Sequence, residues 1–128
     1  DNLDVDNLKG LIVDDSKTAR RHIAKMLSSC GIEHCLQAEN GLQAIDLLHQ
    51  ENIDFMIIDY NMPEMNGQEL VEYLSKSEFS YLPVFMVTSE ENSSRLSGIR
   101  QAGVCALFDK TIDPASLKRA LGSALNDD

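Results

Sequence analysis

The residues best suited to chemistry in this chain stand where short apolar runs end. Asp14 and Asp15 follow the run LIV, and Asp59 follows the run FMII. Two more runs, VFMV and VCALF, lead to Thr88 and to Lys110. Three carboxylates held close together repel one another, so a site built from them needs positive charge. Mg²⁺ prefers oxygen ligands of this kind, and the ammonium group of Lys110 would add a second cation.

Such a set of groups matches the requirements of phosphoryl transfer. A metal ion and a lysine would stabilise the phosphoryl oxygens, and the hydroxyl group of Thr88 would donate a hydrogen bond to another of them. Asp59, between these groups, would be the natural nucleophile. Each residue alone also has an ordinary explanation, because an Asp-Asp-Ser sequence commonly caps a helix and a single polar strand end is commonly solvated. A site exists only if these positions meet in the folded chain.

The apolar runs are typical of strands buried on both faces, because they are short, continuous and bounded by polar residues. Strands are predicted at residues 11–13, 55–58, 84–87 and 104–108, with a weaker edge strand at residues 32–38. Between these runs, apolar residues recur at the spacing of amphipathic helices. The helical patterns cover residues 19–30, 40–51, 67–77, 92–102 and 117–125. Gly31 and Gly103 stand where helices commonly end.

Strands that alternate with helices predict an α/β fold. The expected architecture is a doubly wound, five-stranded parallel sheet with right-handed crossovers and helices on both faces. In such a sheet the carboxyl ends of all strands point to one edge, where binding sites form. The polar residues expected at this edge are Asp14, Asp15, Asp59, Thr88, Ser89, Asp109 and Lys110.

Length and composition fit one globular domain, because 128 residues with 43% apolar side chains suffice for one core. The net charge of −10 argues against direct binding to nucleic acid or to an anionic membrane surface. No apolar run approaches the ~20 residues of a membrane span. Three cysteines without metal-ligand spacing are expected to be reduced thiols of a cytoplasmic protein. Residues 1–7 form an acidic extension without an initial methionine, typical of a processed end or a piece of a longer chain.

Four segments carry a family resemblance. LIVDDSKTARRHIAKML, FMIIDYNMPEMNGQEL, VFMVTSEE and ALFDK resemble the receiver domain of two-component response regulators, and among these most closely the single-domain regulators of the chemotaxis type. The resemblance implies a receiver domain at residues 8–126 with a flavodoxin-like fold and strand order 2-1-3-4-5. It further implies a phosphorylation-dependent signalling switch rather than a conventional enzyme.

The resemblance also implies a role for each residue at the phosphorylation site. Asp59 would accept a phosphoryl group from a histidine kinase, a phosphotransfer protein or a small phosphodonor. The receiver would catalyse only its own phosphorylation and dephosphorylation. The cofactor would be Mg²⁺, held by Asp14, Asp15, Asp59 and Asn61. Asp15 would be a direct ligand and Asp14 a ligand through water, and the backbone carbonyl group of Asn61 would complete the protein ligands.

The remaining roles concern the switch and the lifetime of the phosphoryl group. By resemblance, Thr88 would bind a phosphoryl oxygen and move on phosphorylation, and Lys110 would form an ion pair with the acyl phosphate. Asn61 and Glu90 would flank the path of the hydrolytic water and give a short-lived phosphoryl group. The fourth helix, fifth strand and fifth helix would form the output face toward a downstream protein target or a fused output domain. These residues identify neither the kinase nor the target.

Two positions depart from the family pattern. Leu107, on the output face, occupies the place that usually holds an aromatic residue. Phe108 is out of register by one, which turns it to the opposite face of a strand. We therefore expect a switch without an aromatic rotamer change. Thr111 follows Lys110 where the family commonly has a proline in a cis bond, and a cis bond without proline costs about 2.5–4 kcal/mol. We predict a trans bond between Lys110 and Thr111.

Two other function classes share parts of this pattern. A phosphatase of the haloacid dehalogenase type also places a nucleophilic Asp at a strand end, but its general acid/base Asp two residues later is replaced here by Asn61. A flavodoxin-like cofactor module needs a phosphate cradle after the first strand, and Asp14 and Asp15 would repel that phosphate. Neither turnover of phosphomonoesters nor a flavin is therefore expected.

Overall fold

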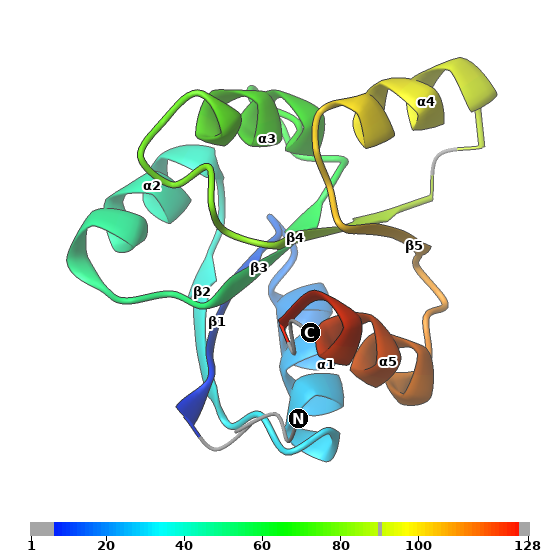
Figure 1. The fold of residues 1–128 in the computed structure, drawn as a ribbon. Helices are drawn as coiled ribbons and strands as arrows, with labels where there is room; N and C mark the ends of the chain where they lie inside the picture. The colour runs from blue at the N-terminus through cyan, green and yellow to red at the C-terminus, as the bar shows by residue number, and fades with distance from the viewer. Residues whose placement is uncertain (1–6, 90, 126–128) are drawn as a thin grey trace.

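The computed structural model describes residues 7–89 and 91–125, and it has the predicted α/β architecture (Figure 1). The first six residues, which make up most of the expected acidic extension, lie outside this part of the chain, as does Glu90. The strands are β1 (Lys9–Val13), β2 (His34–Ala38), β3 (Phe55–Asp59), β4 (Val84–Thr88) and β5 (Ala106–Asp109). The helices are α1 (Lys17–Ser29), α2 (Gly41–Gln50), α3 (Gly67–Ser75), α4 (Ser93–Gln101) and α5 (Pro114–Leu125).

The five strands form one parallel sheet with the order β2-β1-β3-β4-β5, which confirms the predicted fold. Helices α1 and α5 cover one face of the sheet, and α2, α3 and α4 cover the other (Figure 1). The chain order reverses direction in the sheet at β1 and β3, which are neighbours although β2 lies between them in sequence. In open α/β sheets, sites form beyond the strand ends at such a switch point.

Alternate residues of the central strands contribute to two separate hydrophobic cores. In β3, Met56 and Ile58 face the core under α2, α3 and α4, whereas Phe55 and Ile57 face the core under α1 and α5. All five residues of β3 are buried, including Asp59 at its end. Burial on both faces explains why the sequence shows continuous apolar runs rather than an alternating pattern. It also gives Asp59 a rigid backbone.

All five predicted strands differ from the observed ones by one or two residues at one or both ends. The strand predicted at residues 104–108 is Ala106–Asp109, and the one predicted at 32–38 is His34–Ala38. Ile32 is buried but closes the end of α1, where its N–H donates to the carbonyl oxygen of Leu27. β1, β3 and β4 are longer than predicted, because strand pairing continues through residues that do not belong to an apolar run, such as Lys9, Asp59 and Thr88. Gly31 and Gly103 follow helix ends with φ of 94° and 112°, as expected of helix-terminating glycines.

Leu107 and Phe108 lie on opposite faces of β5, as predicted. Leu107 packs against the core under α2, α3 and α4, whereas Phe108 packs against the core under α1 and α5. The aromatic ring is therefore on the face of β5 opposite to Leu107. Within the described residues no peptide bond is cis, so the bond between Lys110 and Thr111 is trans, as predicted.

Candidate functional site

The carboxyl ends of β1 and β3 bring three carboxylates together. Val13 pairs with Ile58 in the sheet register, so Asp14 and Asp59 are the next residues of neighbouring strands. Asp14, Asp15 and Asp59 each place a carboxylate oxygen within 4.8 Å of the other two. Asp14 and Asp59 are buried and Asp15 is exposed, so the cluster opens to solvent on one side. The strand-end pattern in the sequence thus predicted a real cluster.

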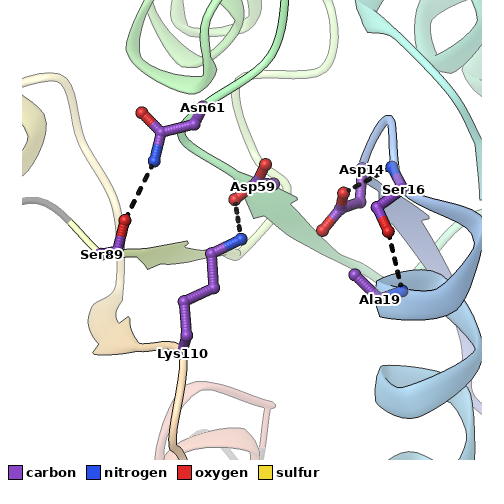
Figure 2. A network of polar contacts seen from close by, with 7 residues as sticks. All are labelled: Asp14, Ser16, Ala19, Asp59, Asn61, Ser89 and Lys110. Atoms are coloured by element: carbon purple, nitrogen blue, oxygen red, sulfur yellow. Dashed lines mark hydrogen bonds and ion pairs between the residues drawn. The ribbon is translucent and has the colours of Figure 1, made fainter.

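Lys110 reaches this cluster from beyond the end of β5 (Figure 2). Its Nζ lies 2.7 Å from Oδ1 of Asp59, whose side chain is only 3% exposed. Burial is the main cause that raises the pKa of Asp59, and the charge of Asp15 acts in the same direction. Lys110 and the backbone N–H of Asn61 act against this shift. The Asp59 carboxylate is therefore largely desolvated, while the adjacent ammonium group of Lys110 favours its ionised form.

Asp14 is held in place by the turn into α1. Its Oδ1 accepts a hydrogen bond of 2.8 Å from the N–H of Ser16 (Figure 2). Burial raises the pKa of Asp14, the bond from Ser16 lowers it, and the charge of Asp59 raises it. The cap of α1 is Ser16, whose Oγ accepts from the N–H of Ala19. Because Ser16 already caps the helix, capping does not account for the acidic pair.

Arg20 is a neighbour of the cluster that the sequence analysis did not identify. It is 9% exposed although it lies in the first turns of α1. Its Nη1 donates to the carbonyl oxygen of Asp14 at 2.6 Å, and its Nε donates to Oε1 of Gln37 on β2 at 3.0 Å. The available signal was its spacing, because Arg20 precedes Ile23 and Leu27 by three and seven residues on the buried face of the helix.

Two other predicted residues, Thr88 and Asn61, lie at the end of β4 and in the loop after β3. Thr88 is the last residue of β4, and its side chain is 2% exposed one position beyond the residue that pairs with Asp59. Asn61 is exposed, and its Nδ2 donates to Oγ of Ser89 at 3.5 Å (Figure 2). This contact joins the loop after β3 to the loop after β4. Glu90, which with Asn61 is expected to set the lifetime of the phosphoryl group, lies outside the described residues.

Asp109 lies at the end of β5, at the predicted edge of the sheet, but its carboxylate is engaged locally. Its Oδ1 accepts hydrogen bonds from the N–H and the Oγ1 of Thr111, at 2.8 Å and 2.6 Å. These bonds lower the pKa of the exposed Asp109 carboxyl group. They shape the turn that carries Lys110 toward Asp59. Asp109 is thus an exposed residue of an edge strand that supports the turn at Lys110.

The start of α3 closes tightly against the end of β3. Asn66 caps α3 in a capping box with Glu69. The N–H of Gly67 donates to the carbonyl oxygen of Tyr60, and a Cβ atom at Gly67 would lie 2.8 Å from the carbonyl oxygen of Asp59. Only glycine permits this approach of two backbones. The loop that follows Asp59 is thus fixed at both ends.

The donor set fits Mg²⁺. All three side chains offer carboxylate oxygens, and among the described residues only Lys110 forms an ion pair with one of these carboxylates. Three carboxylates against one ammonium group leave net negative charge at the end of the sheet, as expected of a site for a hard divalent cation. Asp15, the exposed member, lies on the side from which an ion and water can enter.

Comparison with known proteins agrees with the fold and the acidic site. Residues 11–122 match the family model described as the response regulator receiver domain. The chain is 41% identical over 117 residues to Chemotaxis protein CheY1 of Helicobacter pylori, covering 89% of this chain and 94% of that protein. It is 39% identical over 120 residues to a Chemotaxis protein CheY homolog of Campylobacter jejuni, covering 92% of each. Chemotaxis protein CheY4 of Vibrio cholerae has a similar structure, with a TM-score of 0.81, 28% identity and coverage of 92% and 98%.

The fold and the carboxylate cluster define a receiver of the two-component type. The chain belongs to the response regulator receiver family, as its match to the family model and its relatives show. Receivers of this kind serve phosphorylation-dependent signalling and are not conventional enzymes. Neither the phosphatase nor the flavodoxin hypothesis gains support from these similarities. In the part of the chain that the structure describes, no helix has the length and apolar character needed to cross a membrane.

Proposed function

We propose that Asp59 accepts a phosphoryl group from a histidine kinase, a phosphotransfer protein or a small phosphodonor, in a reaction that requires Mg²⁺. The observation that supports this most directly is the position of Asp59. It is a buried carboxylate at a rigid strand end, 2.7 Å from the ammonium group of Lys110 and within 4.8 Å of two further carboxylates. Such a carboxylate is poorly solvated and therefore a better nucleophile than one in water.

The covalent step forms one bond and breaks one. A carboxylate oxygen of Asp59 attacks the phosphorus atom, and the bond from phosphorus to the donor nitrogen or oxygen breaks. The bonding electrons leave with the donor, which takes up a proton from water where its basicity requires one. Lys110 stays beside the transferred group and neutralises part of its charge. Mg²⁺, when bound by Asp14, Asp15, Asp59 and the Asn61 carbonyl group, supplies the remaining positive charge on the phosphoryl oxygens.

The proposed switch begins at Thr88 and ends on the face of α4, β5 and α5. Thr88 would donate its hydroxyl hydrogen to a phosphoryl oxygen, which requires a movement of the loop after β4. Leu107 packs against the core beneath α4, so this movement would change the packing at the output face. A downstream protein or a fused output domain would bind the changed face with a different affinity. Asn61 and Glu90 would leave the phosphoryl group open to water and so shorten its lifetime.

The test is incorporation of label from acetyl phosphate in the presence of Mg²⁺. Wild-type protein should be labelled, and Asp59→Asn should not, because no other carboxylate within residues 7–89 and 91–125 combines burial with the Lys110 contact. Asp46→Asn is the control, since it removes the charge of an exposed aspartate on α2 that contacts none of the described residues of the site. This control should be labelled like the wild type. Labelling of Asp59→Asn at the wild-type level would reject the assignment.

A further inference from the structure

Arg20 is a buried cation that forms no ion pair with a carboxylate of the described residues. Its two directed contacts go to the carbonyl oxygen of Asp14, at 2.6 Å, and to the amide oxygen of Gln37, at 3.0 Å. A buried guanidinium group is normally paired with a carboxylate or serves a specific function. Here it joins the N-terminal half of α1 to the end of β1 and to the edge strand β2. The acidic cluster lies directly beyond the peptide that it holds.

The contact completes a set of three restraints on Asp14. The N–H of Asp14 donates to the carbonyl oxygen of Ala38 at 3.1 Å, and the side chain accepts from the N–H of Ser16 at 2.8 Å. Arg20 holds the third polar group, the carbonyl oxygen. That oxygen lies in the same rigid plane as the backbone nitrogen of Asp15. Fixing it therefore fixes the direction in which Asp15 leaves the strand.

We infer that Arg20 is a positioning residue for the metal-binding carboxylates of Asp14 and Asp15. It acts through the main-chain carbonyl group of Asp14, and Gln37 holds the guanidinium group in the required orientation. The inference rests on the proposed function, because it presupposes that these carboxylates bind Mg²⁺. Bonds of this indirect kind to ligand residues orient the ligands and commonly affect metal affinity.

The sign of the effect separates positioning from simple electrostatics. Removal of a cation near an acidic cluster makes the local potential more negative, so electrostatics alone predicts tighter binding of Mg²⁺ when Arg20 is replaced. Loss of positioning predicts weaker binding. A purely structural role predicts lower stability with unchanged affinity. The three explanations therefore predict a higher, a lower and an unchanged affinity for Mg²⁺, respectively.

The experiment compares Arg20→Met with Arg21→Met. Methionine keeps much of the aliphatic stem of Arg20 and removes its donors, while Arg21 is the next residue on α1, is exposed and carries the same charge. Affinity is measured by competition of Mg²⁺ against Mn²⁺, with the free Mn²⁺ counted by electron paramagnetic resonance. We expect Arg20→Met to bind Mg²⁺ about tenfold more weakly than the wild type. Arg21→Met should bind as tightly as the wild type or slightly more tightly.

Two further variants keep the test decisive if Arg20→Met does not fold. Arg20→Lys retains the charge and a donor for Asp14 but cannot also hold Gln37 in the same way, so it should fall between wild type and Arg20→Met. Gln37→Met changes an exposed residue without changing net charge and should weaken Mg²⁺ binding to a smaller extent. Circular dichroism at the temperature of the titration establishes that each variant is folded.

Unchanged or tighter Mg²⁺ binding in the folded Arg20 variants would overturn the inference and leave the proposed function intact, provided that the wild type binds. A wild-type protein that binds neither Mn²⁺ nor Mg²⁺ would overturn the metal site itself, and the inference with it. Weaker binding in Arg20→Met together with wild-type binding in Arg21→Met would support positioning through the Asp14 carbonyl group.

Discussion

Replacement of Asp14 by asparagine should stabilise the metal-free protein. Asp14 is 1% exposed, and its carboxylate lies within 4.8 Å of the carboxylates of Asp15 and Asp59. Two unit charges about 4.8 Å apart repel by roughly 3.5 kcal/mol at an effective dielectric constant near 20. Lys110 offsets part of this repulsion, and asparagine keeps an oxygen for the N–H of Ser16. We therefore expect the free energy of unfolding to rise by about 2 kcal/mol.

The pH dependence of the free energy of unfolding tests the same repulsion in a second way. Burial raises the pKa of Asp14 and of Asp59 above the ordinary value of 3.8. A carboxyl group whose pKa is raised by folding stabilises the native state while it is protonated, and this contribution is lost as the pH rises through the folded-state pKa. The metal-free wild type should thus lose stability as the pH increases from below 3.8 through that range. The Asp14→Asn variant should lose less stability over the same pH range, because asparagine does not ionise.

Urea unfolding and thermal melting in EDTA at matched ionic strength measure this difference. A gain of about 2 kcal/mol corresponds to roughly 6–10 °C in Tm for a chain of this size. Asp46→Asn, an exposed position on α2, removes the same charge and serves as the control, with an expected change within about 0.5 kcal/mol. The reasoning would be refuted if both variants gained equally, or if the advantage of Asp14→Asn were as large at acidic as at neutral pH. Excess Mg²⁺ should shrink or reverse the advantage, because the variant has lost a ligand.

Three further outcomes follow from individual residues. Glu64 has a φ of 72°, so Glu64→Asn should raise the free energy of unfolding by about 0.5–1 kcal/mol in urea titrations, and a loss of stability would contradict this. Burial raises the pKa of Cys35 to about 11, so iodoacetamide at mildly alkaline pH should modify Cys35 far more slowly than the exposed Cys105, as peptide mapping would show; equal rates would be inconsistent with that burial. Structures with and without a phosphoryl mimic should show the loop after β4 moving while Phe108 keeps its rotamer opposite Leu107, and an inward swing of Phe108 would disprove the non-aromatic switch.

Much of the site could be predicted because parallel strands end at one edge. Asp14 and Asp59 each follow an apolar run, so the fold alone brings them together once the runs are read as neighbouring strands. Lys110 was predicted for the same reason, and its long side chain spans the distance from β5 to Asp59. Rules of strand order therefore carry more information about this site than any single motif.

The parts that could not be predicted are side-chain directions that depend on local contacts. Asp109 stands at a strand end like Asp59, but its carboxylate is engaged by Thr111 in an exposed turn. The spacing of Arg20 indicates the buried face of α1, but the sequence does not reveal its contact with the backbone carbonyl group of Asp14. Strand boundaries were wrong for a related reason, since ladder hydrogen bonds include polar residues as readily as apolar ones.

The central claim is that Asp59 carries the phosphoryl group. Wild-type protein incubated with acetyl phosphate and Mg²⁺ can be reduced with borohydride, which converts an aspartyl phosphate to homoserine, and then mapped by mass spectrometry. We predict homoserine at position 59, dependent on both phosphodonor and Mg²⁺. Homoserine at position 14 or 15, or none at position 59 in a protein that incorporates label, would contradict the account.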